Sequence, residues 1–441
     1  MTSLRMDTPV LGRPESRPDR RIGTVRRRRI VYVEGYDPRG AEAYHQMFQR
    51  SCERFSKTFD KTWFDKSSPV SLALGTVEID SEDLAHWSLE LRSANWQVAT
   101  RYDFLRLERH IRADMGGPLA RQIPRALGWI IDDLTSGAQW RIFRASWLFG
   151  LHLLSIQLLL LVWLALSVAI GLAALRIVVA SLAQPMALGV VAAMLAAPAA
   201  LLALKPLAHR WFVNQITNCW ATLRRFGRGQ PTWLDPAIEA GARHLVAVAR
   251  ANDADELVVV GHSTGSVIAA AIVARALTLD PDLGRRGSRL VLLTLGSVMP
   301  AVALHPAATR MRDIIKRLAV EPTLAWIECQ SRKDVMNFAD FDPVEGVGVH
   351  VDQHRNPLIW PVRFKDMVSP AYYRRLRWNF FRMHFQYIAA GDRPTTHDYV
   401  LLVGGPMALA DWAEHHDLAF LRDGMTPGIS PCSDAGASRH R

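Results

Sequence analysis

The segment between Arg144 and Lys205 restricts the possible folds more than any other part of this chain, because its sixty residues carry a single charge, Arg176. Residues 147–175 and 185–204 are two apolar stretches within it, each at least 20 residues long. At about 1.5 Å per residue, a helix of this length crosses the roughly 30 Å hydrocarbon core of a bilayer. The sequence therefore predicts a transmembrane helical hairpin over residues 141–205. The alternative interpretation is a very apolar, buried helix pair in a soluble protein.

Basic residues flank the predicted hairpin on both sides. Arg141 and Arg144 precede the first stretch, and Lys205 and Arg210 follow the second. The short connector between the stretches carries only Arg176. Since positively charged flanks are retained on the cytoplasmic side of a membrane, this pattern predicts a two-pass protein with both soluble ends in the cytoplasm. The bilayer itself is then the first partner to expect.

The N-terminal residues form a second region of unusual composition. Residues 1–29 contain nine arginines against three acidic residues, so they supply +6 of the formal net charge of +11. They hold few apolar side chains, and a segment that buries little apolar surface does not offset its ordering entropy. We expect disordered tails at residues 1–28 and 423–441. The basic tail either contacts anionic lipid headgroups or is simply solvated. No nucleic-acid partner is expected, because no nucleic-acid-binding motif or aromatic interleaving accompanies it.

The pattern of the remaining residues of the 441-residue chain predicts an α/β domain. Short apolar runs predict buried strands at residues 30–34, 257–260, 290–295, 324–329 and 358–364. Helical patterns separate them, including one that starts at Asp37-Pro38 and a long one from Ser369-Pro370 to about residue 388. Strands that alternate with helices predict a mostly parallel sheet with helices on both faces. The hairpin would divide this domain into residues 29–140 and 206–422.

Gly261-His262-Ser263-Thr264-Gly265 follows the pattern G-x-S-x-G. It comes directly after the valine-rich run at 257–260 and directly before a helical pattern at 266–277, which is the context that this motif requires. In such a turn the serine has a strained backbone and an exposed Oγ, and Gly261 and Gly265 leave room for the neighbouring elements. The motif and its surroundings resemble the nucleophile elbow of the α/β-hydrolase superfamily, in lipase- or esterase-like members. The resemblance covers roughly residues 29–110 and 235–405.

The resemblance implies that an acid and a histidine follow Ser263 in the chain, in that order. The acid is expected just after the strand at 324–329, which favours Asp334, with Asp342 as the alternative. The competing interpretation of Asp334 is a surface ion pair with Arg332 or Lys333.

Two histidines follow the last predicted strand. His384 lies in an aromatic stretch that would hold an imidazole rigidly, and His397 lies in a polar loop, where this superfamily usually places its histidine. We favour His384 and keep His397 as the alternative. The oxyanion hole is expected to use the backbone N–H of Thr264, which follows the nucleophile. A second backbone N–H is expected from Tyr36, in the loop after an early strand.

These residues predict a membrane-anchored serine hydrolase that cleaves a lipid or acyl ester through an acyl-enzyme intermediate. This chemistry requires no metal and no organic cofactor. An acyltransferase or thioesterase on the same scaffold would use identical residues. A third alternative is a membrane scaffold protein that has lost activity. The sequence contains no signal for the oligomeric state or for the identity of the substrate.

Overall fold

The computed structural model describes residues 24–59, 70–93 and 96–415. Residues 1–23 and 423–441 of the two expected tails lie outside this described part. The core is a nine-stranded sheet in the order β2-β4-β5-β1-β6-β7-β8-β9, with β3 paired to β4. Every pair from β5 to β9 along this order is parallel, and β2, β3 and β5 pair antiparallel to β4. The predicted α/β class with a mostly parallel sheet is confirmed.

The strands are β1 Arg27–Val33, β2 Ser71–Leu74, β3 Glu78–Ile79, β4 Leu84–Arg92, β5 Gln97–Leu105, β6 Glu256–His262, β7 Arg289–Leu295, β8 Leu324–Gln330 and β9 Leu358–Pro361. The α-helices before β6 are α1 Ala41–Thr58, α2 Glu108–Met115, α3 Leu119–Thr135, α4 Ala138–Ala145, α5 Trp147–Arg176, α6 Met186–Ala203, α7 Lys205–Arg210, α8 Val213–Gly227 and α9 Leu234–Ala251. Those after it are α10 Gly265–Leu279, α11 Met299–Ala303, α12 Thr309–Val320, α13 Phe364–Met367, α14 Pro370–Leu376, α15 Phe380–His384, α16 Tyr399–Gly404 and α17 Leu409–His415.

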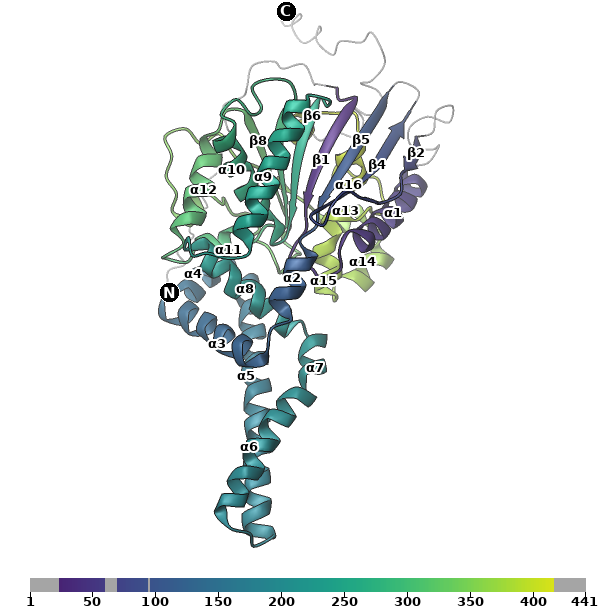
Figure 1. Ribbon diagram of the computed structural model, residues 1–441. Coiled ribbons are helices and arrows are strands. Elements are labelled where there is room, and N and C mark those ends of the chain that lie inside the picture. The colour runs from purple at the N-terminus through teal and green to yellow at the C-terminus, as the bar shows by residue number, and fades with distance from the viewer. Residues whose placement is uncertain (1–23, 60–69, 94–95, 416–441) are drawn as a thin grey trace, which may run out of the picture.

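Helices cover both faces of the sheet (Figure 1). On one face, α9, α10 and α12 pack against alternate residues of the central strands, such as Val31 and Val259. On the other face, α1 and the helices after β9 pack against the residues between them, such as Tyr32 and Val260. All seven residues of β6 are buried, which is why its sequence is a continuous apolar run and not an alternating one.

The two apolar helices α5 and α6 form a stalk that projects from one end of the α/β body (Figure 1). A π-helical segment, Ile177–Ser181, continues α5, and a short connector joins this segment to α6. Both helices are long and apolar enough to cross a membrane. Only 22% of the most apolar 18-residue segment of the first is buried, and only 11% of that of the second. Small residues hold them together: a Cβ on Gly171 would lie 2.8 Å from Ala197 Cβ. Such close backbone approach is typical of membrane helix pairs.

The boundary predicted between the basic N-terminal tail and the α/β domain was wrong. The expected tail ended at residue 28, but β1 begins at Arg27 and Arg28 is only 1% exposed. The Arg28 Nε lies 2.7 Å from a carboxylate oxygen of the buried Glu256, and its other nitrogens donate to backbone carbonyls of Gly405 and Met407. A fully hydrogen-bonded ion pair makes this burial tolerable, and the partners are more than 200 residues away in sequence.

Two helix predictions were also wrong in their extent. The helix expected from Ser369-Pro370 to residue 388 is divided into α14, α15 and a 3₁₀ turn, Phe385–Ile388, because Asn379 starts a new helix by accepting a hydrogen bond from the Arg382 N–H. The first helix begins at Ala41, not at Pro38, since Asp37 pairs with Arg39 and does not act as a helix cap. Arg39, before the first helix, and Phe381, after the second break, line the same cavity.

One buried carboxyl in the sheet leads to a prediction about pH. Glu328 on β8 is hydrogen-bonded to Thr294 on β7, and burial raises its pKa from 4.5 to about 8. A carboxyl whose pKa is raised by folding stabilises the protein fully below about pH 4.5, and this contribution is lost as the pH rises through about 8. Glu328→Gln is neutral at all pH values. We expect its melting temperature to match the wild type near pH 5 and to exceed it by roughly 5 °C at pH 9. A pH-independent difference in thermal unfolding would contradict this.

Candidate active site

Ser263 occupies a sharp turn between β6 and α10. Its φ is 58°, a left-handed conformation that is uncommon for residues other than glycine. The Ser263 N–H donates to the Leu295 carbonyl at the end of β7. A Cβ on Gly261 would lie 2.7 Å from the Gly265 carbonyl oxygen, and one on Gly265 would overlap the Val33 carbonyl of β1. The strand, the helix and β1 therefore meet too closely for side chains at the two flanking positions.

This crowding predicts the effect of Gly265→Ala. The added methyl group would collide with backbone atoms of β1. Unlike a side chain, these atoms cannot move aside by changing rotamer, so either β1 or the turn at Ser263 must shift. Overpacking of this kind costs about 1–3 kcal/mol. We expect a lower melting temperature and a much weaker reaction of Ser263 with a serine-directed probe. Gly128→Ala is a suitable control, because a Cβ there has no neighbour within 4 Å and its backbone, like that of Gly265, does not have a positive φ. Equal loss of probe reactivity in both variants would contradict the steric explanation.

His384 and Asp334 are hydrogen-bonded to each other beside this turn. The distance from His384 Nδ1 to Asp334 Oδ2 is 2.7 Å, and the two side chains are 3% and 0% exposed. The other oxygen of Asp334 accepts a hydrogen bond of 2.9 Å from the Met336 N–H. An ionised Asp334 has no proton to give, so Nδ1 donates and Nε2 retains its lone pair. The Asp334 carboxylate therefore holds the imidazole in one tautomer.

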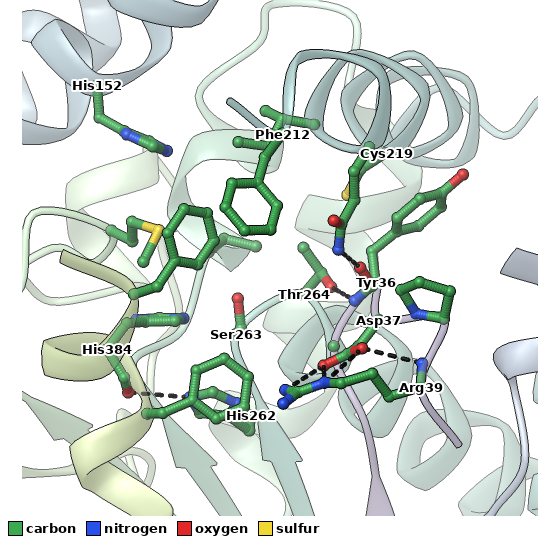
Figure 2. Close-up of a pocket in the computed structure, with 18 of the residues that line it drawn as sticks. Tyr36, Asp37, Arg39, His152, Phe212, Cys219, His262, Ser263, Thr264 and His384 are labelled. Carbon is green, nitrogen blue, oxygen red and sulfur yellow. Dashed lines mark hydrogen bonds and ion pairs between the residues drawn. The ribbon is translucent and has the colours of Figure 1, made fainter. Parts of the chain in front are cut away.

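The free ring nitrogen of His384 faces the side chain of Ser263 (Figure 2). Nε2 is buried and has no hydrogen-bond partner among the described residues. No hydrogen bond joins it to Ser263 Oγ in the described part of the chain. Catalytic hydrogen bonds are often long in ligand-free sites and shorten when substrate binds. Gly296 makes room for the ring, since a Cβ there would lie 3.0 Å from His384 Cε1.

The alternative residues lie elsewhere or have other partners. Asp342 starts a turn, where its Oδ1 accepts a 2.7 Å hydrogen bond from the Val344 N–H. His397 is buried against Trp360 and Tyr387 and does not line the cavity at Ser263. Burial lowers the pKa of His397 to about 3. The structure thus places His384 and Asp334, and neither of their alternatives, next to the elbow.

The surface ion pair between Asp334 and Arg332, the competing interpretation of Asp334, does not form, because Arg332 pairs with Asp340. Arg332 Nε lies 2.5 Å from Asp340, and both side chains are largely exposed. Asp334 points the other way, into the protein.

A second histidine, His262, was not predicted as a site residue, and it supports His384. The Nε2 of His262 lies 3.1 Å from the carbonyl oxygen of His384, and the centroids of the two rings are 4.7 Å apart with the ring planes tilted by 36°. Burial, together with the nearby His384, holds the pKa of His262 well below its usual range. His262 is therefore neutral, and its hydrogen bond ties α15 to the elbow. Its position inside the motif, directly before Ser263, is the sequence signal that could have identified it.

The two predicted oxyanion donors lie on the other side of Ser263 from His384 (Figure 2). The Thr264 N–H has no hydrogen-bond acceptor among the described residues. The Tyr36 N–H donates to Thr264 Oγ1 at 2.6 Å, so an oxyanion would reach it only after the Thr264 side chain rotates.

These groups line one cavity of about 520 Å³. Its walls are mainly apolar and include the aromatic side chains Phe149, Phe212, Trp220, Phe381 and Phe385. A cavity of this size and lining suits an apolar ligand of moderate length.

His152 from α5 also points into the cavity (Figure 2). His152 was not predicted as a site residue, because hydropathy identifies an apolar helix but not what its first turns contact. Cys219 lines the same space, but burial raises the pKa of its thiol far above the usual value, so it remains protonated and unreactive.

One group of residues elsewhere has the composition of a cation site. Asp132, Asp133 and His305 offer ligand atoms within 4.8 Å of one another. Arg224 already holds Asp133 through two hydrogen bonds of 2.7 and 3.0 Å, and Arg228 pairs with Asp132. With both carboxylates neutralised, this cluster is a salt-bridge network that ties α3 to α8, and its donor set does not suit a divalent cation.

Comparisons with known proteins identify no relative of this chain. No protein family matches it, and neither does any curated protein or solved structure.

Proposed function

We propose that this protein is a serine hydrolase of the α/β-hydrolase type, anchored in a membrane by α5 and α6. The observation that carries the proposal is the buried 2.7 Å hydrogen bond between His384 Nδ1 and Asp334, placed so that His384 Nε2 faces a serine in a strained strand-to-helix turn. A folded protein rarely maintains a left-handed serine and an unpaired buried imidazole nitrogen without a function for them.

In the proposed reaction, Ser263 Oγ attacks the carbonyl carbon of an acyl ester while His384 Nε2 accepts the hydroxyl proton. The negatively charged carbonyl oxygen is stabilised by the Thr264 N–H and, after rotation of the Thr264 side chain, by the Tyr36 N–H. His384 then gives the proton to the departing alcohol. Water attacks the acyl-enzyme by the same route in reverse and releases the acid. Asp334 stabilises the imidazolium in both halves of the reaction.

Strand order also supports the hydrolase assignment. The loop that carries Tyr36 follows β1, and β1 pairs with β6, the strand that ends at the candidate nucleophile. Asp334 lies in the loop after β8, and His384 ends α15, which comes after β9, so both residues follow the strands at the same edge of the sheet. This order matches the one expected for the superfamily.

For the membrane anchor we propose that both soluble parts face the cytoplasm, as the basic flanks Arg141, Arg144, Lys205 and Arg210 favour. The exposed apolar surface of the α5–α6 stalk supports an anchor more than a buried helix pair. An acyltransferase would use the same serine. Product analysis in the presence of a competing alcohol separates the two reactions.

The test of the proposed chemistry is labelling of the full-length protein in detergent with a water-soluble fluorophosphonate. We expect covalent modification of one serine, Ser263, identified by peptide mass spectrometry. Heat-unfolded protein should not react, because the reactivity depends on the folded site. A folded protein that shows no labelling at Ser263 would favour the inactive scaffold and would overturn the hydrolase proposal.

A further inference from the structure

Exposed aromatic side chains gather at the end of the body from which the stalk projects. Outside residues 147–204, ten large apolar side chains of the described residues are exposed, and eight of them lie on α3, α4, α7, the α7–α8 junction and the α14–α15 segment. These elements occupy the stalk end in Figure 1. We call the aromatic members the aromatic collar: Trp140, Trp211, Phe212, Trp378 and Phe380. Aromatic rings at this level relative to apolar helices are typical of a bilayer interface.

The same end of the protein is strongly basic. No aspartate or glutamate occurs at residues 134–234 or 367–391, which include the stalk with its flanks and the α14–α15 segment. Arg374, Arg375, Arg377 and Arg382 are all exposed, and none of them has an ion-pair partner among the described residues. The acidic residues that border this segment are engaged elsewhere, Asp366 with Arg363 and Asp392 with Ser369. An unpaired arginine cluster beside a membrane anchor suits the phosphate of an anionic lipid.

The collar and the cavity at Ser263 share a wall. The rings of Phe212 and Phe381 pack at 4.1 Å, and both line the cavity, as does Arg382. Phe149 and His152 of α5 line it as well, so the stalk begins at the cavity itself. An apolar chain that moves from the bilayer along the collar would therefore meet aromatic surface all the way to the serine.

We propose that the ester cleaved at this site is an anionic membrane lipid, drawn from the bilayer with its acyl chain passing the Phe212–Phe381 contact and its phosphate held by the arginines of the α14–α15 segment. This inference rests on the proposed hydrolase function. Water supplies the hydroxyl of the released fatty acid, and the alcohol oxygen that leaves the acyl carbon takes up the remaining proton.

The first test measures substrate preference in reconstituted full-length protein. The wild type is given vesicles of pure phosphatidylcholine or vesicles with about 30% phosphatidylglycerol, a negatively charged lipid. We expect phosphatidylglycerol to be hydrolysed at least 10-fold faster than phosphatidylcholine. In R374Q/R375Q/R377Q this ratio should fall to near one, whereas R243Q/R285Q/R286Q, which removes equal charge from exposed sites on α9 and the α10–β7 loop, should keep it. A wild-type ratio near one, or an unchanged ratio in the first variant, would overturn the proposal.

The second test does not depend on activity. A fluorescent dye on Trp378→Cys should be quenched by lipids that carry bromine on their acyl chains, and the same dye on Arg286→Cys, at an exposed site 82% accessible, should not. Absence of quenching at position 378 would exclude the collar from the interface, even if Ser263 reacts with the soluble fluorophosphonate. Quenching without any fluorophosphonate labelling would instead retain the membrane contact and reject the hydrolase.

Discussion

Ser263→Ala is expected to abolish ester hydrolysis, with kcat for a soluble p-nitrophenyl ester falling by about 10⁵–10⁶-fold. The alanine has no hydroxyl to attack the carbonyl carbon, so no acyl-enzyme forms. The cavity, the oxyanion donors and His384 remain, and these account for whatever rate survives. The variant should also fail to react with a fluorophosphonate.

Loss of folding would not explain this result, and the structure provides a control for it. Ser263 Oγ makes no hydrogen bond within the described part of the chain, so its removal takes a partner from no buried polar group. Ser263→Gly also lacks the hydroxyl, and glycine adopts the φ of 58° without strain. We therefore expect Ser263→Gly to melt at or above the wild-type temperature and yet to be inactive. Substantial hydrolysis by either variant would show that another group is the nucleophile.

Asp334→Asn is expected to lower kcat by about 10⁴-fold without unfolding the protein, since the two side chains are nearly identical in size. The Met336 N–H would keep the amide oxygen as its acceptor, which turns the amide NH₂ toward His384 Nδ1. Two donors would then face each other, unless the imidazole moves its proton to Nε2. In that tautomer His384 Nε2, the nitrogen that faces Ser263, carries a proton and has no lone pair with which to accept another.

Asp342→Asn is the matched control, because Asp342 was the alternative acid in the sequence. Its Oδ1 accepts hydrogen bonds from the Val344 and Glu345 N–H groups, and an asparagine oxygen accepts them equally well. We expect its kcat to stay within a few-fold of the wild type. Comparable losses in the two variants would mean that Asp334 has no special role in positioning His384.

The local features of this protein were predictable from sequence because they depend on neighbouring residues. The apolar stretches at 147–175 and 185–204 became α5 and α6, since the length and composition of a membrane-sized helix are properties of one segment. The turn at Ser263 was expected from a valine-rich strand, two glycines and a following helix, all within about twenty residues.

Charge patterns were less reliable because they say nothing about distant partners. Arg27, Arg28 and Arg29 belong to a basic run that resembled a solvated tail, yet they form the start of β1. Arg28 is buried against Glu256 on β6, and Arg29 pairs with Asp103 on β5. Whether an arginine is solvated or buried depends on the carboxylate that the fold brings to it.

The composition of the site was decided by tertiary structure for the same reason. From the sequence alone, Asp334 and Asp342 were both acceptable acids and His384 and His397 both acceptable histidines. Only packing distinguishes them: one histidine is held between Asp334 and the elbow, and the other is buried between Trp360 and Tyr387. The contribution of His152 from the stalk likewise depends on where α5 meets the body. Short-range chain geometry thus determined the hairpin and the elbow, whereas contacts between residues far apart in the chain exist only once the sheet has assembled.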